Sequence, residues 1–221
     1  MAALVDAGWT EGRWLRAERQ TAGKGRLGRD WRSPEGNLYT STLIRPQPGD
    51  PAIGGLGLLV GVALCEAIRA LMPASNVQLK WPNDIMAGQA KLAGILLERS
   101  GEAIIVGIGV NVRSAPALPD RLTIALADLV GGAEITAAVL LEALADRFDH
   151  WLVRWRLEGF APVREAWLAS AHPIGTGLKV STVNEKALSG QFLGLEADGA
   201  LILGLDDGTH HVIHSGDVGF L

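Results

Sequence analysis

Residues 77–112 read VQLKWPNDIMAGQAKLAGILLERSGEAIIVGIGVNV, and three strand-like apolar runs follow one another within them. These runs cover residues 77–80, 92–98 and 104–112, and a hairpin signal at residues 87–89 lies between the first two. Short β-prone runs bounded by Gly, Pro, Asn and Asp predict strands joined by tight turns. The stretch therefore predicts a β-sheet.

Further strands and helices are predicted on both sides of this stretch. Residues 14–18 and 38–44 are strand-like, and a turn signal at residues 33–37 precedes the second run. Helical patterns cover residues 53–71, 136–155 and 160–171, with Thr136 as the N-cap of the second helix. That helix carries an apolar stripe that predicts core packing: Leu140, Leu141, Leu144, Phe148, Trp151 and Trp155. Strands and helices without strict alternation predict the α+β class.

The last quarter of the chain has a different character. Strand-like runs cover residues 178–183, 188–196, 200–205 and 210–214. Turn signals at Asn184-Glu185, Asp198-Gly199 and Asp206-Asp207-Gly208 separate them. This pattern predicts a small β-barrel or SH3-like module, with a domain boundary near Gly175. We therefore expect two domains, residues 1–173 and residues 174–221.

The composition limits the classes of function. The chain has 221 residues, 48% of them hydrophobic and 20% charged, and a formal net charge of −4. These values predict a soluble globular protein and disfavour broad binding to DNA or to anionic membranes. Cys65 is the only cysteine, so no internal disulfide can form, and no targeting segment is visible. We expect a cytoplasmic protein in which the glycine-containing apolar stretch 53–67 is a core helix and not a membrane span.

The segment Gly23-Lys24-Gly25-Arg26-Leu27-Gly28-Arg29 combines three cations with three glycines. Glycine lets backbone N–H groups approach an anion, while Arg and Lys pair with phosphate or carboxylate. Holding three like charges on one ordered loop favours a compensating anion. A solvated hairpin turn is the alternative, because basic loops rich in glycine are common.

Two further motifs carry polar groups at strand ends. In Lys80-Trp81-Pro82-Asn83-Asp84, the amine can hold a phosphate, the amide a base or ribose, and the carboxylate a Mg²⁺ ion. The alternative is a strand end followed by an Asx-type turn, with the tryptophan in the core. In Lys91-Leu92-Ala93-Gly94, the lysine is either an edge cation or a stabiliser aimed at an oxyanion.

Two glycines and an asparagine mark a third strand. Gly107 and Gly109 lie on one face of the run at residues 104–112, and Asn111 follows them. Missing side chains at alternate strand positions leave room for a flat ligand. Each of these motifs is a weak signal on its own.

Taken together, GKGRLGRDW (23–31), KWPND (80–84), KLAGILLE (91–98) and GIGVNV (107–112) resemble the motifs of the biotin protein ligase family in order and spacing. The resemblance implies a mixed β-sheet with packed helices, as in class II synthetases and biotin–lipoyl ligases, followed by an SH3-like module. It implies that biotin and MgATP form biotinyl-5′-AMP and pyrophosphate. The biotin then passes to a lysine of the biotin carboxyl carrier protein of acetyl-CoA carboxylase.

The resemblance also implies roles for individual residues. Those expected on biotin or its adenylate are Gln20, Lys24, Gly25, Arg26, Lys91, Gly94, Gly107 and Gly109. Those expected on the nucleotide are Arg26, Arg29, Trp31, Lys80, Asn83 and Asn111. Arg26, Lys91 and Asp84 are the expected catalytic residues, and Asp84 is also the expected Mg²⁺ ligand.

Two family features are not found in this sequence. No Ser-Thr-Asn motif occurs before Gln20, and residues 1–5 resemble the middle of the helix that follows that motif. Either the chain start is misplaced or the segment is truly truncated; we expect the first, because an exposed half-helix and a lost edge strand would cost stability. No N-terminal helix-turn-helix region is found either, so we expect a ligase-only protein that does not bind DNA. The sequence leaves open whether two copies of the chain pair through their sheet edges.

Three alternative functions are also open. A lipoate–protein ligase would share the fold, although the glycine-rich and histidine-containing motifs of those enzymes are absent here. A non-catalytic pseudo-ligase would keep a biotin or nucleotide slot, and only the absent Ser-Thr-Asn motif favours it. A nucleic-acid module would grip phosphates with its basic loop, and the net charge of −4 counts against it.

Overall fold

The structure is a computed structural model that describes residues 1–182 and 187–221, and a six-stranded sheet organises its larger part. The strand order is β1-β2-β6-β5-β4-β3, and every ladder between these strands is antiparallel. The strands are β1 (Leu15–Ala17), β2 (Leu38–Ile44), β3 (Val77–Lys80), β4 (Asp84–Ala87), β5 (Ala90–Ser100) and β6 (Ala103–Val110). Among the described residues, parallel pairing occurs only at isolated bridges. The observed sheet is therefore antiparallel, whereas the resemblance implies a mixed sheet.

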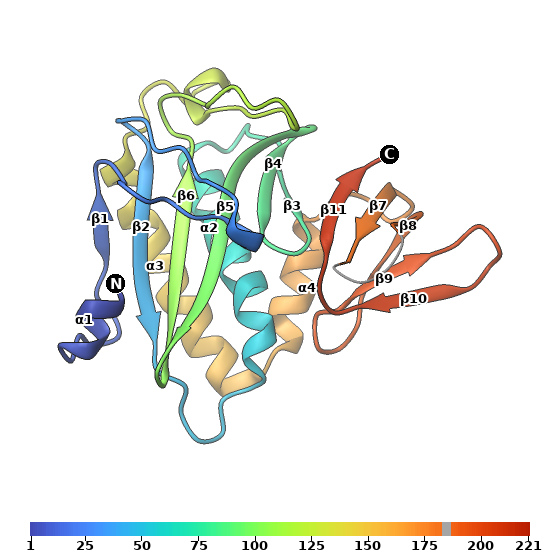
Figure 1. The fold of residues 1–221 in the computed structure, drawn as a ribbon, viewed down its shortest axis with the longest axis horizontal. Helices are drawn as coiled ribbons and strands as arrows, with labels where there is room; N and C mark the ends of the chain where they lie inside the picture. Colours follow the sequence, from blue (N-terminus) through green and yellow to red (C-terminus); the bar gives the residue numbers. More distant parts are fainter. Residues whose placement is uncertain (183–186) are drawn as a thin grey trace.

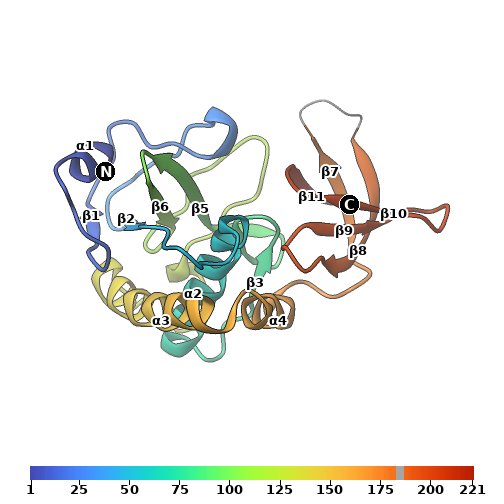
Figure 2. The same cartoon turned by 90° about the horizontal axis from the view of Figure 1, so that it is seen from below.

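Three helices cover one face of this sheet, and the basic loop crosses the opposite face (Figures 1 and 2). The helices are α2 (Leu56–Leu71), α3 (Ala137–Glu158) and α4 (Ala161–Ser170). A short helix, α1 (Ala2–Asp6), lies beside the β1 edge, and the 3-10 turns are η1 (Arg26–Gly28), η2 (Ile53–Gly55) and η3 (Leu126–Asp128). The large face without helices is therefore the one left for a ligand.

The core forms between the sheet and these helices. The Thr136 side chain accepts a hydrogen bond from the Val139 N–H, which caps α3 as predicted. Of the predicted stripe, Leu140, Leu144, Phe148, Trp151 and Trp155 are buried, and Leu141 packs at the margin of the core. Residues 53–71 are long and apolar enough to span a membrane, but 67% of that window is buried within the fold. This segment is a core helix.

A second sheet follows α4 and stands beside the first (Figure 1). Its strands pair antiparallel in the order β10-β9-β8-β7-β11. They are β7 (Gly177–Ser181), β8 (Leu188–Leu195), β9 (Leu201–Gly204), β10 (His210–Ile213) and β11 (Asp217–Phe220). Among the described residues no pairing between β10 and β11 closes this sheet into a barrel. The predicted turn at Asn184-Glu185 lies outside the described residues, and the division at residues 173 and 174 stays a prediction.

Trp81 and Arg164 are among the side chains that join the second sheet to the first part of the chain. The Trp81 indole is buried, and its Nε1–H donates to the Gly199 carbonyl at 3.0 Å. The Arg164 guanidinium, on α4, donates to the carbonyl oxygens of Leu195 and Glu196. Trp81 therefore has the core role that the sequence left as the alternative. It is buried at the junction of the two sheets.

Most predicted strand and helix positions agree with the structure, and two strands were not predicted. β4 consists of only four residues, directly after the Lys80–Asp84 turn, and β11 of four residues near the end of the chain. Both runs are too short to show a period of alternating burial. The predicted hairpin at residues 87–89 does join β4 to β5, with Gly88 at φ +59°.

Candidate functional site

The basic loop folds back on itself above the open face of the sheet. The Gly25 N–H donates to the Arg29 carbonyl at 2.7 Å, and the Trp31 N–H donates to the Gly23 carbonyl at 3.0 Å. A Cβ at Gly23 would lie 2.5 Å from the Trp31 carbonyl oxygen, so this crossing requires glycine. The loop is thus an ordered hairpin, and its side chains have defined positions.

A buried carboxylate lies between two lysines below the loop. The Lys91 Nζ donates to Asp84 Oδ1 at 2.5 Å, and the Lys80 Nζ lies 3.7 Å from Asp84 Oδ2. Asp84 begins β4 and Lys91 lies near the start of β5, so the hairpin between these strands sets the Lys91–Asp84 pair. Burial lowers the pKa of Lys80, and the charge of Asp84 opposes that shift.

Arg26 reaches from the loop to the same region. Its Nη1 donates to the Gly216 carbonyl at 3.0 Å and lies 3.4 Å from Asn83 Oδ1. Burial lowers the pKa of this guanidinium, while the charges of Asp217 and Asp84 raise it. The Asn83 amide nitrogen donates to the Ile95 carbonyl at 2.6 Å, so this side chain also braces β5.

Glycines make the floor of the site. Asp84, Gly94 and Gly109 are opposite one another on β4, β5 and β6, so the carboxylate borders two positions without side chains. The Trp31 indole lies on this floor: a Cβ at Gly109 would meet its ring at 2.6 Å, and one at Gly94 would meet it at 3.1 Å. The Lys91 Nζ is 5.6 Å from the centre of the same ring.

Two polar atoms in this region have no hydrogen-bond partner among residues 1–182 and 187–221. They are Trp31 Nε1, a donor, and Asn111 Oδ1, an acceptor, and both atoms are buried. Buried polar groups are normally satisfied, so unpaired ones at a cavity point to a ligand that completes them. Asn111 is itself held in place, because its amide nitrogen donates to the Ile124 carbonyl at 3.2 Å.

The loop and the sheet face enclose a cavity of about 770 Å³, within the range of small-molecule sites. The predicted residues that line it are Gln20, Lys24, Gly25, Arg26, Arg29, Trp31, Asn83, Asp84, Lys91, Gly94, Gly107, Gly109 and Asn111. Lys80 is the exception, because its Nζ is directed to Asp84 and to the Val218 carbonyl at 2.8 Å. The structure therefore brings together the predicted motifs except for this one amine.

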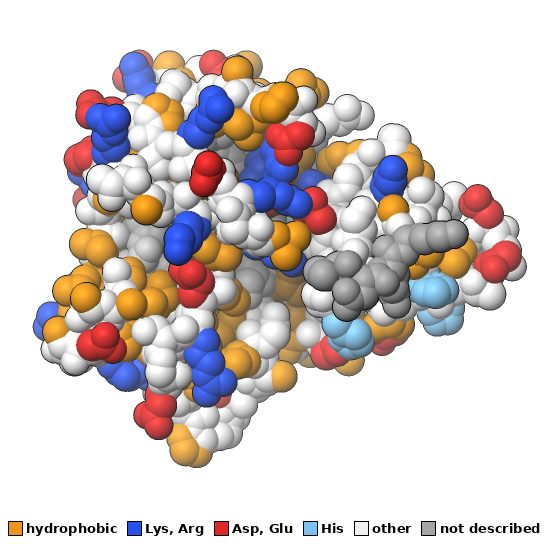
Figure 3. Space-filling model, viewed as in Figure 1, with side chains coloured by type: hydrophobic (Ala, Val, Ile, Leu, Met, Phe, Trp, Pro, Cys, Tyr) orange, Lys and Arg blue, Asp and Glu red, His pale blue; other side chains and the backbone are white. Residues whose placement is uncertain are grey.

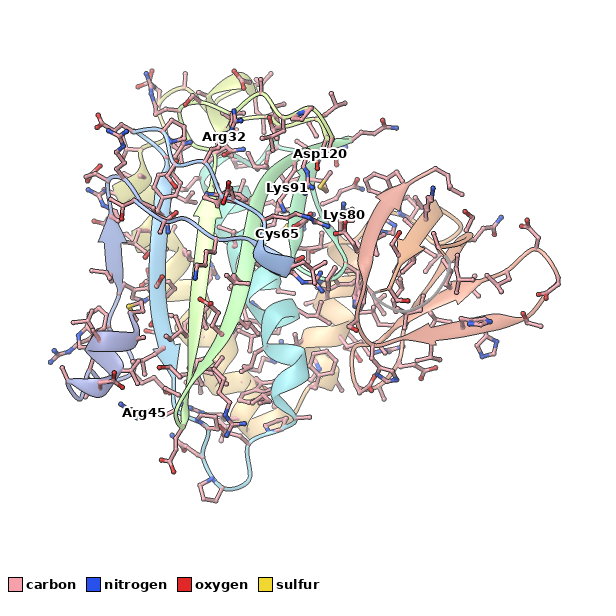
Figure 4. The ribbon with its side chains drawn as sticks, viewed as in Figure 1. Arg32, Arg45, Cys65, Lys80, Lys91 and Asp120 are labelled. Atoms are coloured by element: carbon pink, nitrogen blue, oxygen red, sulfur yellow. The ribbon has the colours of Figure 1, made fainter. Side chains whose placement is uncertain are left out.

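The surface views place these charges at the junction of the two sheets. Figure 3 shows Lys and Arg side chains, with acidic ones beside them, in the hollow between the large sheet and the C-terminal sheet. Figure 4 shows Lys91, Lys80 and Asp120 toward this side of the molecule, whereas Arg45 lies at the opposite end of the large sheet. The cationic end of the cavity thus borders the second sheet.

The residues around Asp84 do not form a protein cage for Mg²⁺. Both carboxylate oxygens face lysine ammonium groups, and the described residues contain no group of three His, Cys, Asp or Glu side chains able to hold a metal ion. Mg²⁺ is commonly bound through one or two carboxylates together with substrate phosphates. A Mg²⁺ ion here fits better as part of an ATP complex than as an ion held by Asp84.

Several residues that line the cavity were not predicted from the sequence. Thr40 and Ser41 line the cavity from β2, where polar residues inside an apolar strand were an available signal. Asp120 and Arg121 line it from the segment after β6, and Asp217 from β11. No local pattern marks these three, since the tertiary fold alone brings them to the cavity.

Comparisons with known proteins agree on one family. Residues 6–113 match the biotin/lipoate A/B protein ligase family, and residues 179–221 match the biotin protein ligase C-terminal domain. The chain is 38% identical over 200 residues to a biotin–[acetyl-CoA-carboxylase] ligase of Paracoccus denitrificans, covering 86% of this chain and 83% of that protein. It is 33% identical over 219 residues to the bifunctional ligase/repressor BirA of Bacillus subtilis, covering 94% of this chain and 66% of that protein.

A solved structure gives the same result. The biotin protein ligase of Aquifex aeolicus in complex with biotin and ATP superposes with a TM-score of 0.86 at 28% identity, covering 96% of this chain and 91% of that one. The sequence relatives and this structural likeness extend over both sheets. The chain belongs to the biotin protein ligase family.

Proposed function

We propose that this chain is an ATP-dependent biotin–protein ligase. It forms biotinyl-5′-AMP and then transfers biotin to a lysine of the biotin carboxyl carrier protein of acetyl-CoA carboxylase. The observation that carries the proposal is that Arg26 and Lys91 line one cavity whose floor has glycines at positions 94, 107 and 109. The names of the Paracoccus and Aquifex proteins support the choice of biotin and ATP as substrates.

In the first step, a biotin carboxylate oxygen bonds to the α-phosphorus of ATP. The bond from that phosphorus to the bridging oxygen breaks, and pyrophosphate leaves. Carboxylate and triphosphate are both anionic and repel each other until cations offset their charge. Arg26 and Lys91 are placed to do so, and Asp84 fixes the position of the Lys91 ammonium. Mg²⁺ bound to ATP supplies further positive charge to the phosphates.

The floor and the loop protect the product. A mixed anhydride of biotin and AMP hydrolyses if water reaches it, so the site has to exclude water. The Trp31 indole covers Gly94 and Gly109 and has an unpaired N–H within the described chain. The ring can move off this floor when the flat ligand enters and then cover it, with the indole N–H as a donor to the ligand.

In the second step, the neutral amine of the acceptor lysine attacks the acyl carbon. An amide bond forms, the bond from the acyl carbon to the phosphate oxygen breaks, AMP leaves, and the amine loses its proton. Asp84 is not open to receive this proton, because both of its oxygens already face ammonium groups. We therefore assign the proton to solvent or to the departing AMP, and no protein side chain acts as the base.

The test is pyrophosphate release from MgATP with biotin or lipoate as the acid. We expect release with biotin alone. Lys91→Met should abolish it, because the amine is needed at the carboxylate and α-phosphate, whereas Lys179→Met, at an exposed site on β7, serves as the matched control. Release with lipoate but not biotin would make the protein a lipoate ligase. No pyrophosphate release with either acid would favour the pseudo-ligase.

The remaining properties are proposals of the same kind. We propose a cytoplasmic protein, which the single cysteine supports, and one that does not bind DNA or membranes, which the net charge of −4 supports. A gel shift with a biotin operator, in the presence of biotin and ATP, should show no retarded band. Sedimentation measures the number of copies in solution. β1 is one of the two edge strands of the large sheet, and a second copy could pair there.

A further inference from the structure

Three successive residues of the C-terminal sheet contact three cations of the preceding part of the chain. The Arg26 Nη1 donates to the Gly216 carbonyl at 3.0 Å, and the Lys80 Nζ donates to the Val218 carbonyl at 2.8 Å. Between them, the Arg29 guanidinium donates twice to the Asp217 carboxylate, at 3.1 and 2.7 Å. We call residues 216–218 the latch.

The strand geometry explains why these groups face the cavity. The Leu221 N–H donates to the Gly177 carbonyl, so the backbone groups of residues 217, 219 and 221 are directed toward β7. The carbonyls of Gly216 and Val218 therefore point away from β7, to the free edge of the sheet. Free strand edges need partners or cover, and here the cations of the first part of the chain supply them.

The Arg29–Asp217 pair adds charge to this contact. Burial would raise the pKa of the Asp217 carboxyl, but the hydrogen bonds and the charge of Arg29 outweigh it and lower that pKa. The same hydrogen bonds raise the pKa of Arg29. The two side chains are 39% and 45% exposed, so the pair lies at the mouth of the cavity, where both residues line it.

Apart from the latch, the basic loop is attached to the large sheet through the Trp31 ring on Gly94 and Gly109 and the 3.4 Å contact of Arg26 with Asn83. Its tip residue Leu27 is 64% exposed and has φ +56°, a conformation that side chains other than glycine seldom adopt. The hydrogen bonds at Gly25 and Trp31 close the hairpin on itself and do not attach it to the sheet. The fixed positions of Arg26 and Arg29 therefore depend on contacts made from outside the loop.

We propose that Asp217 is a positioning residue: together with the two latch carbonyls, it holds Arg26 and Arg29 over the cavity and so sets how long the acyl-adenylate is retained. The part concerning the adenylate rests on the proposed function. The part concerning the loop does not. The C-terminal sheet thus contributes to the ligand site through one carboxylate and the edge of β11.

Limited proteolysis with trypsin tests the loop without any ligand. Cleavage after Lys24 reports loop opening, because this residue lies in the loop and no hydrogen bond or ion pair in the structure joins it to the latch. We expect Asp217→Asn to speed this cleavage about two- to fivefold, as the loss of an ion pair of this exposure allows. Asp206→Asn, in the exposed turn between β9 and β10, is the matched control, and Asp217→Glu should restore most of the protection. Equal rates in the Asp217→Asn and Asp206→Asn proteins would overturn the proposal.

A chase experiment tests retention of the adenylate. The protein is loaded with biotin and radiolabelled ATP, and release of the labelled adenylate is followed after excess unlabelled adenylate is added. We expect Asp217→Asn to speed release by a factor similar to that for proteolysis and to raise KM for ATP more than it lowers kcat. Unchanged release would overturn the retention role. If the unmutated protein forms no adenylate, the proposed function fails. The rate of cleavage after Lys24 still tests whether Asp217 holds the basic loop in place.

Discussion

Replacing Asp84 with asparagine would remove a carboxylate that two lysine ammonium groups share. The side chains of Asp84, Lys80 and Lys91 are only 11%, 13% and 15% exposed, and the ammonium groups lie 3.7 and 2.5 Å from the carboxylate. The Lys80 Nζ keeps its hydrogen bond to the Val218 carbonyl in the variant. Among the described residues the Lys91 Nζ has no other hydrogen bond, so the variant would leave it as a largely buried charge without a counter-charge.

The size of the effect follows from that unpaired charge. Removing one partner of a buried ion pair costs about 3–5 kcal/mol, and the residual exposure of this cluster places the cost at about 3 kcal/mol. For a chain of this length, each kcal/mol lowers the melting temperature by about 2–4 °C. We therefore expect Asp84→Asn to melt about 6–12 °C below the unmutated protein.

A double-mutant cycle separates this charge effect from simple loss of packing. Lys91→Met removes the stranded cation, so adding it to Asp84→Asn should return about 1–2 kcal/mol of unfolding free energy. The assay is urea unfolding of the two single variants and the double variant, followed by circular dichroism. Additive costs, with a coupling free energy below about 0.5 kcal/mol, would refute the reasoning, because the carboxylate would then not offset the lysine charge.

Three other variants test separate parts of the account. Arg26→Gly removes a charge-assisted contact worth about 1.5–3 kcal/mol, so the rate of adenylate release should rise about 10- to 100-fold. The released adenylate should then label bystander lysines. Unchanged labelling selectivity, measured by mass spectrometry, would contradict this role of Arg26. Gly109→Ala places a Cβ 2.6 Å from the Trp31 ring and should lower biotin-dependent pyrophosphate release more than tenfold, whereas Gly57→Ala, whose Cβ would make only a 3.7 Å contact with Leu97, should not. His172 is buried between the rings of Phe192 and Phe220, and burial lowers its pKa. Unfolding frees this histidine to bind a proton, so stability is full above about pH 6.5 and falls as pH drops below it. His172→Leu should flatten that part of the stability–pH curve, and an unchanged slope in urea titrations would refute the assignment.

The strands and helices could be predicted where burial imposes a period on the sequence. β2 and β3 begin and end where the pattern predicts, and the 22 residues of α3 contain the predicted stripe. The short strands β4 and β11 could not, because four residues cannot establish a period. The strand order and the antiparallel pairing of the large sheet could not be predicted from the sequence either, because they depend on contacts between distant segments.

The site could be predicted in its residues but not in its geometry. The motifs supplied glycines and cations, and the fold brings every predicted site residue except Lys80 to one cavity. The sequence places Asp84 near Lys91 but cannot show that its two oxygens face two ammonium groups, which argues against its predicted role as a Mg²⁺ ligand. It cannot show the contact between Arg29 and Asp217 either, because 188 residues separate the two side chains.

The central claim is that the cavity under the basic loop carries out both steps of biotin transfer. The most direct measurement isolates the protein after incubation with biotin and MgATP and then adds the biotin carboxyl carrier protein without further ATP. We predict that protein-bound biotinyl-5′-AMP is recovered and that one lysine of the carrier gains biotin as AMP is released, in the unmutated and Lys179→Met proteins but not in Lys91→Met. Recovery of no adenylate, or of an adenylate that never reaches the carrier, would contradict the account.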